Sequence, residues 1–147
     1  MGKLYVAYGS NLNLSQMAYR CPSARIYGAG QLNNWELVYR GSMVNSHATI
    51  ERRRGSTVPV LLWDISEEDE FHLDIYEGYP KYYFKQNVMV DTGKSKKKAM
   101  VYIMDRSRMP GKPSASYIET IRKGYLDNDL DMSIFEESLR KNKFECS

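Results

Sequence analysis

The stretch Tyr8-Gly9-Ser10-Asn11-Leu12 ends the apolar run from Leu4 to Ala7 with residues that are typical of turns. Glycine tolerates a positive φ and allows a close approach to the backbone, while serine and asparagine favour the start of a helix. Leu14 to Arg20 then carries apolar residues at helical spacing. The pattern predicts a strand, a turn and a short helix. Successive amides in such a turn can hold an anion or a carbonyl oxygen, and a purely structural turn is the alternative.

The length and composition are those of one globular domain. The chain has 147 residues, of which 42% are hydrophobic and 27% are charged, so we expect residues 1–147 to form a single domain. No segment is long and apolar enough to span a bilayer, and the N-terminus lacks the shape of a signal peptide. Cys21 and Cys146 have neither metal-ligand nor redox spacing. We therefore expect a reduced, cytoplasmic protein with no membrane partner, and we leave monomer and homodimer both open.

The net charge of +3 is unevenly distributed, with clusters at Arg52-Arg53-Arg54 and Lys96-Lys97-Lys98. Each cluster adjoins a predicted turn, since the arginines precede Gly55-Ser56-Thr57 and the lysines follow Asp91 to Ser95. No aromatic pair is spaced with the arginines as a base-stacking platform would require. We therefore expect no nucleic-acid partner, and a basic adaptor for nucleic acid is kept only as a third hypothesis.

Short β patterns separated by turn residues dominate the middle of the chain. The pair Asn33-Asn34 favours a turn between two strands, and the continuously apolar run from Thr57 to Ile65 predicts a strand buried on both faces. Helices are expected to begin at Ser66 and end at Gly78, to begin at Ser114 and end at Gly124, and to span roughly 132–141. The expected strands after the first are 24–32, 35–39, 47–50, 57–65, 82–91 and 98–105.

Glu77 stands at the C-terminal end of a predicted helix, where the helix dipole disfavours a carboxylate. Burial among neighbouring aromatic side chains would raise its pKa toward the range of a general acid or base at neutral pH. An exposed glutamate at a helix end is the alternative explanation. The aromatic neighbours in the sequence are Tyr76, Tyr79, Tyr82 and Tyr83.

Taken in order, these features resemble the gamma-glutamyl cyclotransferase-like family. The resemblance is carried by the stretch from Tyr8 to Leu12, by Leu73-Asp74-Ile75-Tyr76-Glu77-Gly78, and by Tyr102 and Tyr117 downstream. It covers the chain up to about Gly124 and implies an α+β fold. The implied architecture is a small, closed or nearly closed mixed β-barrel flanked by short helices, with the turn and the glutamate on two walls of one pocket.

The resemblance also implies a reaction that needs no cofactor. The α-amine of a gamma-glutamyl amino acid or gamma-glutamylamine attacks its own γ-carbonyl, which releases 5-oxoproline and a free amine. Glu77 would carry the proton, and amides from Gly9 to Asn13 would hold either the oxyanion or the substrate α-carboxylate. The form with Asn11 argues against the glutathione-specific branch, and Gly78-Tyr79-Pro80 leaves the substrate open. The expected substrate-binding residues are Tyr8, Gly9, Ser10, Asn11, Leu12, Asn13, Tyr102 and Tyr117, of which Tyr102 also fits a core position.

Other kinds of site have weaker support. His47 and His72 are the only histidines, and neither has a second ligand at metal-like spacing, so no metal site is expected. Ser10 and Cys21 lack a neighbouring base for covalent catalysis. A module that binds small ligands in the same pocket without turnover is the alternative function.

Overall fold

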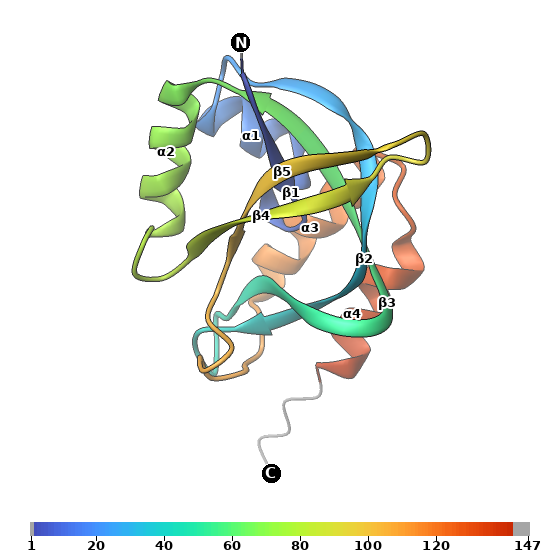
Figure 1. Ribbon diagram of the computed structural model, residues 1–147. Helices are drawn as coiled ribbons and strands as arrows, with labels where there is room; N and C mark the ends of the chain where they lie inside the picture. Colours follow the sequence, from blue (N-terminus) through green and yellow to red (C-terminus); the bar gives the residue numbers. More distant parts are fainter. Residues whose placement is uncertain (1, 143–147) are drawn as a thin grey trace.

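The computed structural model describes residues 2–142 and contains a closed five-stranded barrel with the strand order β1-β3-β2-β4-β5. Strand β1 pairs with β5 in parallel, whereas the other pairs are antiparallel. Helices α2 and α4 lie on opposite sides of the barrel (Figure 1). The expected α+β fold with a closed mixed barrel is therefore confirmed. The elements are β1 (Lys3–Ala7), the 3-10 helix η1 (Ser10–Leu12), α1 (Leu14–Arg20), β2 (Arg25–Arg40), β3 (His47–Ile65), α2 (Glu67–Glu77), β4 (Phe84–Asp91), β5 (Lys96–Ile103), α3 (Ala115–Asp127) and α4 (Met132–Lys141).

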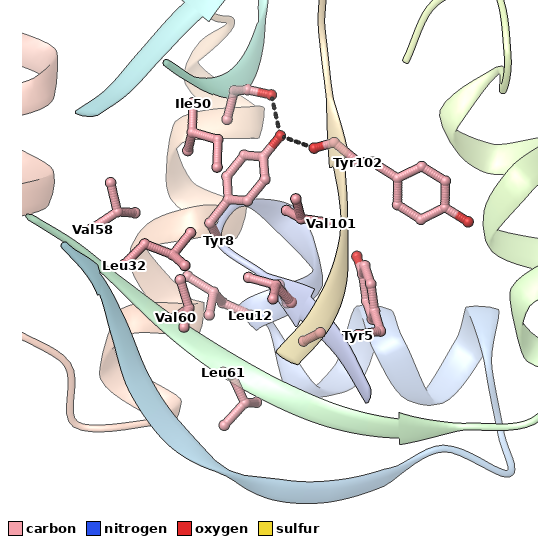
Figure 2. Close-up of a cluster of buried hydrophobic side chains, with 14 of the residues drawn as sticks. Tyr5, Tyr8, Leu12, Leu32, Ile50, Val58, Val60, Leu61, Val101 and Tyr102 are labelled. Atoms are coloured by element: carbon pink, nitrogen blue, oxygen red, sulfur yellow. Dashed lines mark hydrogen bonds between the residues drawn. The ribbon is translucent and has the colours of Figure 1, made fainter. Parts of the chain in front are cut away.

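The first strand, β1, closes the barrel and leads directly into the turn that precedes η1. It pairs with β3 from Lys3 opposite Ile65 to Ala7 opposite Leu61, and with β5 where Tyr5 faces Met100. Apolar side chains from these strands and from η1 pack in one buried cluster (Figure 2). Because the turn follows directly from a strand held on both sides, its position relative to the barrel is well defined.

The two longest strands differ from the expected pattern. Residues 24–39 were expected to form two strands with a turn at Asn33-Asn34, but β2 runs through this pair without reversing. Asn34 has a φ of 68°, and its side chain accepts a hydrogen bond from the Gly55 amide at 3.0 Å. Opposite it, β3 bulges between Arg52 and Thr57. The predicted turns at Asn33-Asn34 and at 55–57 are therefore wrong, because residues that tolerate a positive φ form a bulge here within continuing strands.

The hairpin of β4 and β5 agrees with the expected one, except that its lysines lie in strand β5 rather than in the loop. Lys96 to Lys98 belong to β5 and pair with Asp91 to Met89 of β4, so only Thr92 to Ser95 form the loop. The residues from Ala99 to Met104 are buried. Among the described residues, no helix combines the length and the apolar character needed to cross a membrane.

Helix α2 has both predicted ends. The Ser66 side chain accepts from the Asp69 amide while the Asp69 carboxylate accepts from the Ser66 amide, which is a capping box. Gly78 ends the helix with a φ of 69°. Glu77 is consequently the last residue of the helix, as expected.

Helix α3 continues past Gly124, where the sequence predicted its end, as far as Asp127. A Cβ atom at Gly124 would lie 2.6 Å from the Leu12 Cβ and 2.8 Å from the Asn13 nitrogen. The glycine is needed for close packing rather than for a helix stop, because α3 crosses η1 with almost no space between them. The packing of α3 against Leu12 and Asn13 therefore holds the turn in position.

Candidate active site

A cavity of about 120 Å³ lies where the turn after β1 meets the end of α2. Cavities of about 150 Å³ hold a molecule of the size of benzene, so this space suits one small chemical group. The two parts of the chain that the sequence singled out, around Gly9 and around Glu77, therefore line one site. The lining residues are Tyr5, Val6, Tyr8, Gly9, Ser10, Asn11, His47, Ala48, Tyr76, Glu77, Tyr82, Tyr83, Tyr102 and Tyr117.

Two of the expected substrate-binding residues, Leu12 and Asn13, are not among the residues that line the cavity. Leu12 is fully buried in the hydrophobic core. Asn13 caps α1, where its side chain accepts from the Gln16 amide at 3.0 Å and donates to the Thr120 carbonyl at 3.1 Å. These contacts give both residues a role in holding the turn in place.

The Glu77 carboxyl group is the titratable group of the cavity that matters most for proton transfer. Burial among tyrosine rings raises its pKa to about 8, and the nearby Arg20 guanidinium opposes this rise. The residue as a whole is partly exposed and lines the cavity. Neither oxygen has a hydrogen-bond or ion-pair partner within residues 2–142. A largely desolvated carboxyl group without a partner is unusual in a folded protein and is typical of a functional site.

The turn contributes backbone donors without partners. The amides of Leu12 and Asn13 donate to the carbonyls of Gly9 and Ser10 within the turn, at 3.0 and 3.1 Å. The amides of Gly9, Ser10 and Asn11 have no acceptor in the described part of the chain. They are the first amides of a 3-10 turn and remain free for the same reason as those at any helix start.

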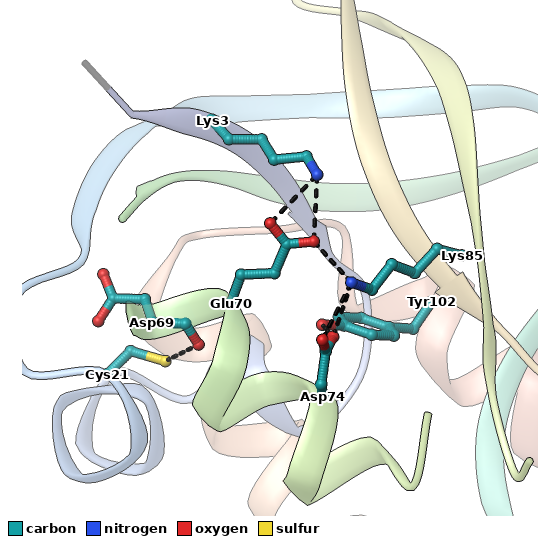
Figure 3. Close-up of polar contacts among 7 residues, drawn as sticks. All are labelled: Lys3, Cys21, Asp69, Glu70, Asp74, Lys85 and Tyr102. Carbon is teal, nitrogen blue, oxygen red and sulfur yellow. Dashed lines mark hydrogen bonds and ion pairs between the residues drawn. The ribbon is translucent and has the colours of Figure 1, made fainter. Parts of the chain in front are cut away.

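Three cavity tyrosines use their hydroxyl protons within the protein. Tyr8 donates to the Tyr102 carbonyl at 2.7 Å (Figure 2), and Tyr83 donates to the Ala48 carbonyl at 2.7 Å. Tyr102 donates to the Asp74 carboxylate at 2.6 Å (Figure 3). The rings of Tyr8 and Tyr102 form part of the wall, as the sequence suggested, but their protons are not available to a ligand.

Tyr117 differs from these three because it accepts. Its hydroxyl oxygen receives the Ala48 amide hydrogen at 2.9 Å, which leaves its own proton free. A Cβ atom at Gly9 would lie 3.6 Å from this oxygen. Tyr117 therefore presents a hydrogen-bond donor close to the turn.

A network of charges supports the outer side of Tyr102 (Figure 3). Lys85 lies 2.9 Å from the Asp74 carboxylate and 2.7 Å from that of Glu70, which also pairs with Lys3 at 3.1 Å. Asp74 thus accepts from both Lys85 and Tyr102. The network joins α2 to β4 and β5, and so fixes the helix that ends in Glu77 against the barrel.

Several residues near the site were not found from the sequence. Tyr5 lines the cavity, and Arg20 stacks at 3.5 Å on the ring of Tyr76, which the sequence had already indicated as a neighbour of Glu77. His47, expected to be an ordinary surface or core residue, lines the cavity and lies 2.9 Å from the Tyr82 hydroxyl through Nδ1. Burial lowers the His47 pKa. No local pattern marks these residues, because strand pairing and helix packing bring them together.

Comparisons with known proteins agree with this arrangement. A gamma-glutamyl cyclotransferase of known structure is 26% identical to the chain, with a TM-score of 0.86 over 94% of this chain and 86% of the other. An uncharacterized protein from Homo sapiens is 27% identical, with a TM-score of 0.85 over 93% of this chain and 86% of the human one. YkqA from Bacillus subtilis shares the fold at 18% identity, with a TM-score of 0.79 over 96% of this chain and 54% of its own.

No protein in the curated set matches the sequence significantly. The family model described as gamma-glutamyl cyclotransferase, AIG2-like, matches residues 5–121, which include both the turn and the glutamate. The chain therefore belongs to the gamma-glutamyl cyclotransferase, AIG2-like family.

Proposed function

We propose that the protein converts a gamma-glutamyl amino acid or a gamma-glutamylamine to 5-oxoproline and a free amine. The observation that carries this proposal is that Glu77 and the turn residues Gly9, Ser10 and Asn11 line the same small cavity. The Glu77 carboxyl group and these three amides have no partner within residues 2–142. The printed name of one similar structure, gamma-glutamyl cyclotransferase, supports the same reaction class.

Glu77 would transfer the proton that the reaction must move. The substrate α-ammonium has to lose a proton before its nitrogen can attack the γ-carbonyl carbon, and the leaving nitrogen has to gain one. A Glu77 pKa raised to about 8 lies closer to the pKa of the substrate α-ammonium than the ordinary glutamate pKa of about 4.3 does. The proton transfer between these two groups is correspondingly less uphill in free energy. One C–N bond forms and one C–N bond breaks. The attacking nitrogen changes from an ammonium to a lactam N–H and loses two protons, while the leaving nitrogen changes from an amide N–H to an ammonium and gains two, so Glu77 would carry protons from the first nitrogen to the second.

The turn would stabilise the negative charge of the substrate. As the nitrogen adds, the γ-carbonyl oxygen becomes an oxyanion, and a single well-placed donor to such an oxygen contributes about 3 kcal/mol. The amides of Gly9, Ser10 and Asn11 and the hydroxyl of Tyr117 are the candidate donors. The substrate α-carboxylate is a second negative group that needs donors. The amides would bind one of these two groups, the oxyanion or the α-carboxylate, and Tyr117 would donate to the other.

The direct test is the release of 5-oxoproline by the Glu77→Gln variant, with a panel of gamma-glutamyl amino acids and amines as substrates. We expect kcat to fall by a factor of about 10² to 10⁴, the usual contribution of general acid and base catalysis, while ligand binding persists. Glu68→Gln is the matched control, because Glu68 is exposed on the same helix. Full activity of Glu77→Gln on a substrate that the wild type turns over would exclude this role for Glu77. Saturable binding with no 5-oxoproline from the wild type would favour the binding module instead.

A further inference from the structure

The hydroxyl group of Tyr5 makes an unusual hydrogen bond at the edge of the cavity. Tyr5 lies in β1, is only 3% exposed, and lines the cavity together with Glu77. Its hydroxyl oxygen lies 2.8 Å from the side-chain nitrogen of Asn11, in the turn. The direction of this hydrogen bond decides whether Tyr5 can act on a ligand.

Arg20 fixes that direction. A guanidinium group can only donate hydrogen bonds, and Arg20 donates to the side-chain oxygen of Asn11. The amide nitrogen of Asn11 must therefore face Tyr5, and since it is a donor, the Tyr5 oxygen must accept. Arg20 is itself held by the Gln16 side chain at 2.7 Å, and the Asn11 backbone carbonyl accepts the Trp63 indole hydrogen at 3.2 Å. A flipped Asn11 side chain would place its amide donors against the guanidinium donors of Arg20, so the arrangement does not reverse.

The hydroxyl proton of Tyr5 is consequently unused. It has no acceptor within residues 2–142, whereas the protons of Tyr8 and Tyr83 in the same cavity bind backbone carbonyls. The Tyr5 oxygen is satisfied as an acceptor, and its capacity to donate remains available. Tyr5 lines the cavity, so a ligand there can supply the missing acceptor.

We propose that Tyr5 is a substrate-binding residue that donates a hydrogen bond to an oxygen of the gamma-glutamyl group, and that Arg20 and Asn11 are positioning residues that aim its proton. This inference rests on the proposed function and adds a donor from β1 to those of the turn and of Tyr117. The chain of donors runs from a charged guanidinium through an amide to a phenol, which polarises the last hydrogen bond in favour of a negatively charged acceptor.

Removal of the hydroxyl group gives the first test. Tyr5→Phe keeps the ring and should lower kcat/KM for 5-oxoproline release by about 10- to 100-fold, the usual effect of a lost hydrogen bond to a charged group. Tyr39→Phe is the matched control, because it removes a buried hydroxyl group that bonds Ser138 at 2.7 Å and does not line the cavity. The control should lose thermal stability and retain kcat/KM.

Reversal of the hydrogen bond gives the second test, in which Tyr5 itself is unchanged. In Asn11→Asp the new carboxylate accepts from both Arg20 and Tyr5, so the Tyr5 proton turns away from the cavity while the Arg20 contact still holds the turn. We expect a loss of kcat/KM similar to that of Tyr5→Phe, and little further loss in the double variant. A purely structural role of Asn11 would instead give losses that multiply, accompanied by a lower Tm.

The same variants are also compared by calorimetric binding of 5-oxoproline, which does not depend on turnover. If Tyr5→Phe retains the kcat/KM and the affinity of the wild type, the inference about Tyr5 is wrong and the proposed function stands. If the wild type releases no 5-oxoproline but binds it, and Tyr5→Phe and Asn11→Asp weaken that binding equally, the donor role holds without the enzymatic one. If the wild type neither reacts nor binds, both proposals fail.

Discussion

Glu77 should make the stability of the protein depend on pH in a way that the Glu77→Gln variant lacks. Burial raises the pKa of the folded-state carboxyl group from 4.5 to about 8. Below pH 4.5 the group is protonated in both the folded and the unfolded states and has no effect on the difference between them. As the pH rises from 4.5 to about 8, the unfolded state loses its proton first, so the wild type becomes progressively less stable relative to the variant.

The size of the effect follows from the same shift. Each pKa unit corresponds to about 1.36 kcal/mol, so a rise from 4.5 to about 8 sets an upper limit of about 5 kcal/mol. The cavity opens to solvent and the Glu77 residue is partly exposed, and water that reaches the carboxylate reduces this cost. The free energy of unfolding of the variant minus that of the wild type should increase by about 1.5 to 3 kcal/mol between pH 5.5 and pH 8.

The assay is urea unfolding of both proteins at several pH values from 5.5 to 9, followed by circular dichroism. The quantity of interest is how the stability difference changes with pH, because any constant offset caused by the amide cancels. The difference should grow up to about pH 8 and then stay level. A difference that does not change with pH would refute the raised pKa of Glu77, and with it the argument that this group is tuned for proton transfer. A difference that shrinks as the pH rises would mean that the carboxylate is stabilised rather than destabilised by folding.

Three further predictions follow from particular residues. The kcat/KM for 5-oxoproline release should fall up to tenfold per pH unit below about pH 7, since the base form of a Glu77 with a pKa of about 8 becomes scarce; a profile that is flat from pH 6 to pH 8 would contradict this. Gly124→Ala should lower the free energy of unfolding by about 2 kcal/mol, because its Cβ would overlap Leu12, and a neutral effect on Tm would show that α3 and η1 are less tightly packed. Asn34→Ala should cost about 1 to 2 kcal/mol because of the positive φ and the lost bond to Gly55, whereas Asn34→Gly should cost less; equal losses in urea unfolding would assign the effect to the side-chain bond alone.

The parts of the fold that the sequence predicted well are those that local chemistry decides. The helix start at Ser66, the glycine stop at Gly78 and the helix from Met132 to Lys141 all lie where the sequence placed them. Each depends on residues within one or two turns of one another. Their local preferences agree with the tertiary structure, so nothing overrides them.

The errors arise where a residue has two uses that only distant contacts distinguish. Asn34 and Gly55 tolerate a positive φ in a hairpin and equally in a bulge, and the choice is made by the pairing of β2 with β3 over their whole length. Gly124 suits a helix end and also suits a close crossing, and the position of η1 decides between them. The same limit applies to the site, where a motif indicates Glu77 but no motif indicates Arg20 or Tyr5.

The directions of the tyrosine protons connect the two halves of the site. A hydroxyl proton aimed at Glu77 would stabilise its carboxylate and lower its pKa. The protons of Tyr8, Tyr83 and Tyr102 are instead bound to carbonyls or to Asp74, so these rings exclude water from the glutamate without donating to it. The tyrosines can therefore raise the Glu77 pKa as effectively as phenylalanines would, while their hydroxyl groups tie the cavity wall together. Donors that remain free, such as that of Tyr117, can then bind substrate oxygens without competition from the base.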